Sequence, residues 1–197
     1  MRQLLIATHN AGKLAEFAAL LAPLGFQAVS AAKLGLPEPA ETAADFAGNA
    51  RLKAQAAARA ARIPALADDS GLCVAALDDG PGIFSAHYAG GDYAAAFARI
   101  IAACAAAEEW RAHFVCALCL AQPDGATRDF TGQAHGRIAT APMPGDGFGY
   151  DPIFIPAGHT RSYAQLGSAL KDRISHRAAA FAQLAAALPS YSTQTSR

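Results

Sequence analysis

The chain has 197 residues, 53% of them hydrophobic and 16% charged, which fits one domain, or one domain with two lobes, around a sizeable core. Sixteen Lys and Arg balance sixteen Asp and Glu, which argues against non-specific binding to nucleic acid or to an anionic membrane as the main activity. A small anionic ligand needs only a few placed cations and is not excluded.

The termini and cysteines predict a cytoplasmic protein in a reduced state. The first apolar run is too short for a signal peptide and is followed by Lys13 and Glu16, and no apolar run reaches the roughly 18 residues of a membrane span. Cys116 and Cys119 are three apart in a predicted strand, so they would point to opposite faces and act as core thiols rather than as a redox or zinc site. We expect no membrane and no stable nucleic-acid partner.

The first half alternates strands with helices. Apolar Leu14, Phe17 and Leu21 recur at helical spacing, and Pro23 and Gly25 end that helix. In chain order, the sequence predicts strands over 4–8 and 26–30, helices over 13–21 and 45–62, and short strands over 65–67 and 71–75 on either side of an acidic loop.

The second half adds a meander and a closing helix. The expected elements are a helix over 92–107, paired strands over 111–121 and 127–136, a Gly/Pro loop over 142–149, a strand over 153–155 and a helix over 177–188 capped by Ser175. The fold class is therefore α/β with a mixed sheet. Residues 1–189 are expected to form one two-lobed domain and residues 190–197 a frayed tail.

A polar loop directly after the first predicted strand is a candidate phosphate site. Its residues are Thr8, His9, Asn10, Ala11, Gly12 and Lys13. Thr8 and Asn10 offer short polar side chains, Gly12 allows close backbone approach, and the start of a helix at Lys13 favours anions. A plain strand-to-helix turn with an exposed lysine explains the loop equally well, because the Walker pattern is absent.

Asp68 and Asp69 follow an apolar strand, and we expect them at its carboxyl end. One carboxylate of such a pair can bind Mg²⁺ and the other can position or deprotonate water. A solvated pair or a turn before Gly71 is the alternative. Glu38 or Glu41 can add a second oxygen ligand.

Near the end, aromatic residues lie beside glycines in the segment Phe148, Gly149, Tyr150 and Asp151. Such a loop can enclose a planar base, although a packed loop end gives the same pattern. His176 and Arg177 begin a helix and offer donors for a carbonyl oxygen or a phosphate, while His176 alone can be a cap residue.

Six motifs in order give a more specific signal than any one of them. They are T-H-N-A-G-K, E-T-x-x-x-F-x-x-N-A with Lys53, A-D-D-S-G, P-G-I-F-S-A-H-Y-A-G, G-F-G-Y-D-P-I-F and S-H-R. With them the chain resembles the inosine/xanthosine triphosphate pyrophosphatases, from about residue 4 to about residue 188. The resemblance implies an elongated two-lobed fold around a mixed twisted sheet, a substrate cleft between the lobes, and a homodimer. It also implies Mg²⁺-dependent hydrolysis of ITP, dITP and XTP to the monophosphate and pyrophosphate, which cleanses the nucleotide pool.

The resemblance also assigns roles. Residues implied to hold the triphosphate are Thr8, Asn10, Lys13 and Lys53, and Ser70 is implied to lie near the nucleotide. Those implied around the base and sugar are Phe148 to Asp151, with Lys171, His176 and Arg177 completing the base pocket. Asp69 would be the acid/base residue and a metal ligand, with Asp68 beside it and Glu41 as the second ligand. Ala40 occupies a place that is often acidic, so Glu38 stays an alternative to Glu41. His87 replaces a usual Arg, which leaves its role open.

The expected reaction is attack of water on the α phosphorus. Asp69 would deprotonate the water, and Lys13 and Lys53 would stabilise the departing pyrophosphate. A donor such as Arg177 would favour the six-oxo group of hypoxanthine or xanthine over the amino group of adenine. Two rivals remain: a nucleotide-binding regulatory module without turnover, and a phosphohydrolase that acts on the γ phosphate or on pyrimidine nucleotides.

Overall fold

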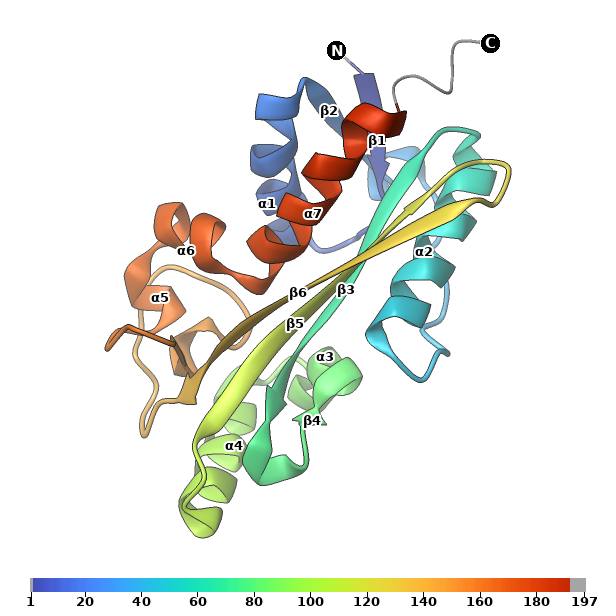
Figure 1. Ribbon diagram of the computed structural model, residues 1–197. Helices are drawn as coiled ribbons and strands as arrows, with labels where there is room; N and C mark the ends of the chain where they lie inside the picture. The colour runs from blue at the N-terminus through green and yellow to red at the C-terminus, as the bar shows by residue number, and fades with distance from the viewer. Residues whose placement is uncertain (1, 192–197) are drawn as a thin grey trace. The chain divides into compact units, whose positions relative to one another are not determined.

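The protein is described here by a computed structural model that covers residues 2–191 (Figure 1). Two compact units divide the chain: unit 1 comprises Met1–Asp69, Cys116–Gly132 and Ala178–Arg197, and unit 2 comprises Ser70–Val115 and Gln133–Arg177. The sheet formed by the described residues has seven strands in the order β2-β1-β3-β5-β6-β7, with β4 paired to β3. Its mixture of parallel and antiparallel pairs confirms the predicted α/β class with a mixed sheet.

Unit 1 is built around parallel strands. β1 (Arg2–Ile6) pairs in parallel with β2 (Phe26–Ser30) and with β3 (Ala65–Val74). Two helices connect these strands, α1 (Ala11–Leu21) and α2 (Phe46–Ala61). The chain passes from β1 to β2 on one side of β1 and then returns to β3 on the other side. This reversal of strand order is the switch point at which open α/β sheets form ligand sites.

Alternation along the strands separates the two faces of unit 1. Ile6 and Leu66 pack in one cluster with α1 and with α7 (His176–Tyr191), whereas Ala65 and Ala67 pack in another with α2 (Figure 1). Successive strand residues point to opposite faces, so α1 and α2 cover different sides of the sheet. Each helix buries the small or apolar stripe that its sequence periodicity predicts.

Unit 2 has an aromatic core. Its elements are β4 (Gly80–Pro81), α3 (Ser85–Ala89), α4 (Tyr93–Ala107), β7 (Phe154–Pro156), α5 (Tyr163–Leu166) and α6 (Ser168–Ile174), together with the adjoining parts of β3, β5 (Arg111–Ala121) and β6 (Thr127–Ile138). The buried rings of Phe114, Phe154 and Tyr163 lie within 6.2 Å of one another, centroid to centroid. Large rings compensate for the small area that the alanine-rich helices bury.

Most predicted elements are confirmed. The strands over 26–30 and 111–121 match exactly, and Asp45 and Asp92 cap their helices through side-chain bonds to Gly48 and Ala95. The terminal helix runs to Tyr191, beyond its predicted end, and residues 192–197 of the predicted tail lie outside the described residues. Sequence analysis missed α3, α5 and α6, which are short and lack a long apolar stripe.

The cysteines are free and buried, as expected. Cys116 packs on the α1 face of the sheet and Cys119 on the α2 face, so their three-residue spacing separates them. Among the residues that the structure describes, no helix has the length and hydropathy needed to cross a membrane.

Candidate active site

The acidic pair lies within a strand, and the predicted acidic loop is wrong. β3 runs without a break from Ala65 to Val74, so Asp68 and Asp69 occupy its middle rather than its carboxyl end. The strand continues because its ends are paired on different partners, at Leu66 with β1 and at Cys73 with β4. β1 ends at Ile6, opposite Leu66, so the acidic pair follows just beyond the carboxyl end of β1.

Strand geometry sends the two carboxylates to opposite faces of the sheet. Asp68 lies on the α1 face, where its Oδ2 is 2.9 Å from Lys13 Nζ and its side chain has no solvent exposure. Lys13 is the third residue of α1, and the N-cap Asn10 accepts the Lys13 backbone N–H through Oδ1 at 3.1 Å. The first turn of α1 thus carries the Lys13 ammonium group, which the buried Asp68 carboxylate holds in place.

Asp69 lies on the α2 face. Its Oδ1 is 3.6 Å from Lys53 Nζ, and its Oδ2 accepts a hydrogen bond of 3.1 Å from Asn49 Nδ2. Lys53 Nζ also donates to Glu41 Oε1 at 2.5 Å. Lys53 is buried, with 3% of its surface exposed. Two carboxylates from separate segments therefore converge on one buried ammonium group.

The charges in this group shift one another's pKa. Burial raises the pKa of Asp69 above its ordinary value and the nearby Glu41 charge adds to this, although Lys53 and the Asn49 bond oppose it. Burial would lower the pKa of Lys53, but Asp69, Asp68 and Glu41 together outweigh it and raise that pKa. Lys53 therefore stays protonated, while Asp69 is a stronger base than an exposed aspartate.

The remaining residues of the first loop are placed by hydrogen bonds. Thr8 is buried, and its Oγ1 accepts the Asn10 N–H at 3.2 Å. His9 is exposed and its Nε2 bonds to the Leu36 carbonyl at 3.0 Å, which ties this loop to the segment before Glu41. Ala11 and Gly12 form the first turn of α1, so their backbone N–H groups lie at the positive end of the helix.

Unit 2 brings together a second set of predicted residues. Asp151 Oδ2 accepts from Lys171 Nζ at 2.7 Å and from the Phe148 backbone N–H at 3.0 Å. Lys171 Nζ also lies 4.2 Å from the centroid of the Phe148 ring, a cation–π contact. Phe148 is 37% exposed, whereas Asp151 and Lys171 are buried. The loop thus exposes the Phe148 ring to solvent, while the buried Lys171–Asp151 ion pair contacts Phe148 and holds it in place.

His176 and Arg177 belong to the same unit. The His176 ring stacks on Phe114 with centroids 4.7 Å apart and planes 13° from parallel, and Arg177 Nη2 donates to Ser70 Oγ at 3.2 Å. Arg177 is 2% exposed, so its guanidinium is held by the fold rather than by solvent. His176 is therefore more than a cap, because its ring is part of the aromatic core.

Tyr150 and Gly149 differ in what they present. The Tyr150 ring is 5% exposed and packs edge-on against Tyr93, and its hydroxyl donates to the Ser85 carbonyl at 2.7 Å. Gly149 adopts a left-handed φ of 61°, which lets the chain turn between Phe148 and Tyr150. Tyr150 thus anchors the loop in unit 2, and its implied place around the base and sugar stays a prediction.

The sequence analysis gave no role to Asn49, Phe114 or Tyr163, although Asn49 is the asparagine of the motif E-T-x-x-x-F-x-x-N-A. Asn49 lies four residues before Lys53, so helical spacing alone places both on one face of α2. Phe114 and Tyr163 gave no such signal, because the contact of Phe114 with His176 and that of Tyr163 with Lys171 are tertiary. His87 is exposed on α3, and Glu38 is exposed in its loop.

The donor set on the α2 face fits a hard divalent cation. Glu41 and Asp69 offer carboxylate oxygens, the ligands that Mg²⁺ prefers, and Mg²⁺ sites often combine one or two carboxylates with substrate phosphates. No group of three or more His, Cys, Asp or Glu with ligand geometry occurs among the described residues. The two lysines and three carboxylates in these ion pairs carry one net negative charge, which favours the binding of a cation.

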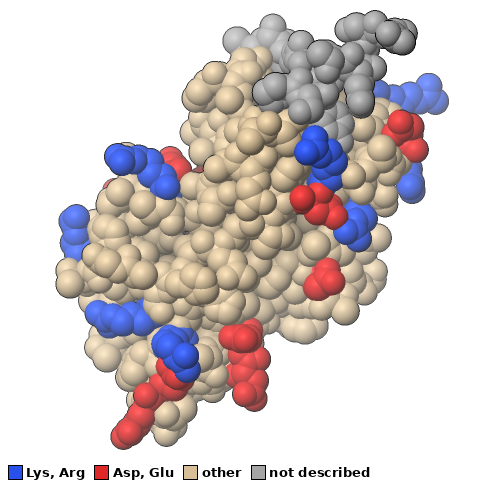
Figure 2. Space-filling model, viewed as in Figure 1, with Lys and Arg blue, Asp and Glu red and all other residues tan. Residues whose placement is uncertain are grey.

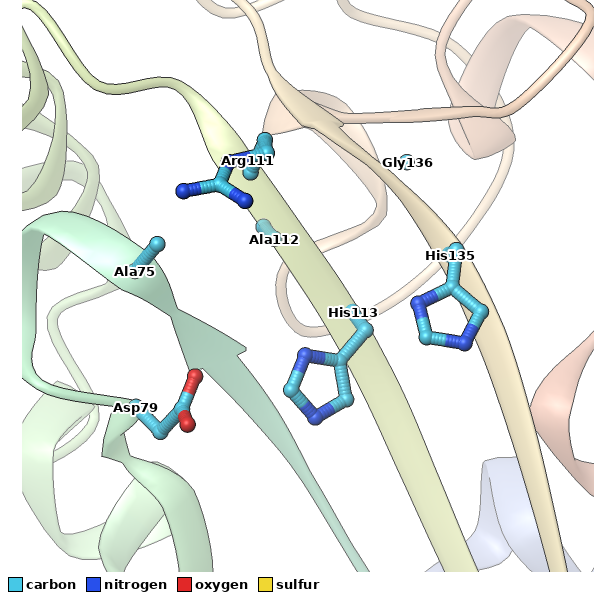
Figure 3. Close-up of a pocket in the computed structure, with 7 residues that line it drawn as sticks. All are labelled: Ala75, Asp79, Arg111, Ala112, His113, His135 and Gly136. Carbon is cyan, nitrogen blue, oxygen red and sulfur yellow. The ribbon is translucent and has the colours of Figure 1, made fainter.

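A pocket of about 380 Å³ in unit 2 has none of the predicted site residues in its lining (Figure 3). It is lined by Ala75, Asp79, Arg111, Ala112, His113, His135 and Gly136. The rings of His113 and His135 lie on β5 and β6 with centroids 5.5 Å apart, and the Arg111 guanidinium bonds to Glu109.

On the face seen in Figure 2, basic and acidic side chains are interspersed, in keeping with the balanced composition.

Comparison with known proteins identifies the family. Residues 4–187 match the Ham1 family. A dITP/XTP pyrophosphatase of Rhodospirillum centenum is 55% identical over 188 residues, which cover 93% of each chain, and one of Gluconobacter oxydans is 50% identical over 177 residues, 89% of this chain and 85% of the relative. The structure of a HAM1 protein from Coxiella burnetii has a TM-score of 0.87 at 38% identity, covering 96% of this chain and 100% of the other. With this match along nearly its whole length, the chain belongs to the Ham1 family.

Proposed function

We propose that the protein hydrolyses non-standard purine nucleoside triphosphates, dITP, XTP and ITP, to the monophosphate and pyrophosphate. The observation that carries the proposal is the convergence of Glu41, Lys53 and Asp69 on one buried point of unit 1. The names of the most similar relatives, which are dITP/XTP pyrophosphatases, support the same substrates.

We assign the phosphate chain to unit 1. Lys13 and Lys53 are already held by carboxylates, so their ammonium groups are preorganised and need no reorganisation when phosphates arrive. The first turn of α1 adds backbone N–H groups, which favour an anion. These donors would stabilise the charge that develops on a departing pyrophosphate.

Asp69 is assigned as the general base. Its carboxylate is buried beside a lysine, with one oxygen held by Asn49, and its raised pKa favours proton abstraction from water. Water would then attack the α phosphorus in line with the pyrophosphate leaving group. Asp68 lies on the other face of β3, so it is assigned to Lys13 and not to the water.

Glu41 and Asp69 are the residues that would hold a divalent cation, for which we propose Mg²⁺. The ion, when bound, would supply further neutralisation of phosphate charge. Glu41 is preferred to Glu38, because Glu41 is the carboxylate that shares Lys53 with Asp69.

We assign the base to the Phe148 loop and its neighbours in unit 2. The exposed Phe148 ring offers a stacking surface, and Lys171 lies against that ring. His176 and Arg177, in the same unit, offer further N–H donors. A donor set of this kind matches the six-oxo group of hypoxanthine and xanthine and leaves a mismatch with the amino group of adenine.

A panel of dITP, XTP, ITP, GTP and ATP with Mg²⁺, assayed separately for pyrophosphate and orthophosphate, tests the proposal. We expect pyrophosphate from the first three and little reaction with ATP. In ¹⁸O-labelled water, the label should enter the nucleoside monophosphate. Label in pyrophosphate would mean attack on the β phosphorus, and orthophosphate with a diphosphate product would mean a γ-phosphatase.

We also propose a homodimer in the cytoplasm, on the resemblance described above. Light scattering coupled to size-exclusion chromatography tests the first part, because a homodimer would show twice the 20.2 kDa mass of the chain. A monomeric mass at micromolar concentration would contradict it.

A further inference from the structure

Asn49 connects two parts of the proposed site, and its bond to Asp69 is only one of its two side-chain contacts. Its side chain is 1% exposed at the first turn of α2. Nδ2 donates to Asp69 Oδ2 at 3.1 Å, and Oδ1 accepts the backbone N–H of Ala43 at 2.9 Å. One amide thus touches the proposed base and the segment that carries Glu41.

The orientation of the amide follows from its partners. A backbone N–H can only donate, so the oxygen of Asn49 must face Ala43. The amino group is then directed at Asp69, whose carboxylate accepts it. No other standard side chain of this size offers one donor and one acceptor at fixed ends of a rigid plane.

The fold around Asn49 leaves it little freedom. Its backbone N–H donates to the Asp45 carbonyl, and the Asp45 side chain caps the same turn through Gly48. A Cβ at Gly48 would lie 2.5 Å from the Ala43 Cβ, so only glycine allows this segment to fold so closely over the helix. Asn49 and Lys53, four residues apart, then face Asp69 from one side of α2.

We propose that Asn49 is a positioning residue for the reaction: its amide fixes the Asp69 carboxylate and, through Ala43, the segment that presents Glu41 to the same point. This inference rests on the proposed function for its catalytic meaning, while the contact itself is a property of the fold. Groups that orient ligating carboxylates in this way typically affect activity by about 10–100-fold when they are removed.

Exchange of the two side chains tests the contact directly. Asn49→Asp keeps an acceptor for Ala43 but loses the donor to Asp69 and sets two carboxylates together. Asp69→Asn combined with Asn49→Asp restores one donor and one acceptor between the same positions. Thermal unfolding in EDTA is measured for the wild type, Asn49→Asp, Asp69→Asn and the double variant. The four Tm values give the coupling between positions 49 and 69, because residues in contact show non-additive effects. Gln55→Glu, on the same helix but bonded to Gly125, is the matched control for an added carboxylate.

We expect Asn49→Asp to lower the Tm and the exchange to recover at least half of that loss. We also expect Asn49→Asp to lower kcat for dITP about 10–100-fold with little change in KM, and Gln55→Glu to keep kcat. The exchanged protein should fold but stay inactive, because position 69 then lacks a base.

Additive Tm losses in the exchange, or a wild-type kcat in Asn49→Asp, would overturn the inference. If Asn49→Asp does not fold, the exchange decides: a folded protein supports the contact and an unfolded one contradicts it. A wild type that releases no pyrophosphate from dITP refutes the proposed function, and the Tm comparison still tests the contact.

Discussion

Lys53 and Lys171 are both buried, yet the two units surround them differently. Lys53 in unit 1 lies among the carboxylates of Glu41 and Asp69, whereas Lys171 in unit 2 lies between Asp151 and the face of the Phe148 ring. Unit 1 thus fixes Lys53 with carboxylates, whereas unit 2 fixes Lys171 with one carboxylate and an aromatic ring. Changes of charge in unit 1 should therefore alter the rate, and changes in unit 2 should alter the choice of base.

The contrast has a physical reason. A phosphate chain carries several negative charges, so its site needs preorganised cations, which are stable in the apo protein only when carboxylates neutralise them. A base is planar and nearly neutral, so its site needs a rigid surface and a few directed donors. On the proposed function, unit 1 would supply the first of these environments and unit 2 the second.

Removal of divalent metal should have the largest effect. After exhaustive treatment with EDTA and dialysis, we expect pyrophosphate release from dITP to stop and to return with MgCl₂, since Glu41 and Asp69 offer oxygen ligands for a hard cation. Full activity of the metal-free protein would contradict the proposal that the charged groups of unit 1 act together with a divalent cation.

Asp69→Asn should lower kcat by about 10²–10⁴-fold, because the amide keeps the size but loses the base. Asp129→Asn is the matched control: Asp129 also pairs with a cation of α2, Arg51, but is exposed, so its loss should leave kcat nearly unchanged. Circular dichroism verifies the fold of both. A wild-type kcat in folded Asp69→Asn would remove Asp69 from the mechanism.

Arg177→Ala should narrow the preference for ITP over ATP in kcat/KM by about tenfold or more, because a buried donor matched to the six-oxo group is lost. Arg173→Ala, on the exposed face of the neighbouring α6, should leave this ratio unchanged. An equal effect of the two variants would show that Arg177 acts through general charge and not through base recognition.

Tyr150→Phe should have the smallest effect on activity. The ring that packs against Tyr93 is kept, while the buried Ser85 carbonyl loses its donor, so we expect a loss of about 1–3 kcal/mol in the free energy of unfolding by urea and little change in selectivity. A changed ITP/ATP ratio with unaltered stability would instead place the Tyr150 hydroxyl at the base.

Some features were determined by local sequence. Apolar periodicity and helix-ending Pro and Gly residues located the helices of residues 11–21, 46–61 and 93–107 to within two residues, because these signals act within one or two turns. The opposite directions of Cys116 and Cys119 followed from strand geometry alone. The six ordered motifs also predicted the family that the comparisons confirm.

Other features were decided only by the tertiary structure. A local pattern cannot tell a polar loop from the middle of a strand whose two ends pair with different partners, so Asp68 and Asp69 were predicted in a loop. The burial of Lys53, the bridge of Asn49 to Asp69 and the stack of His176 on Phe114 join residues 16 to 62 positions apart. Such contacts depend on how the elements pack, and the sequence near each residue carries no record of its distant partner.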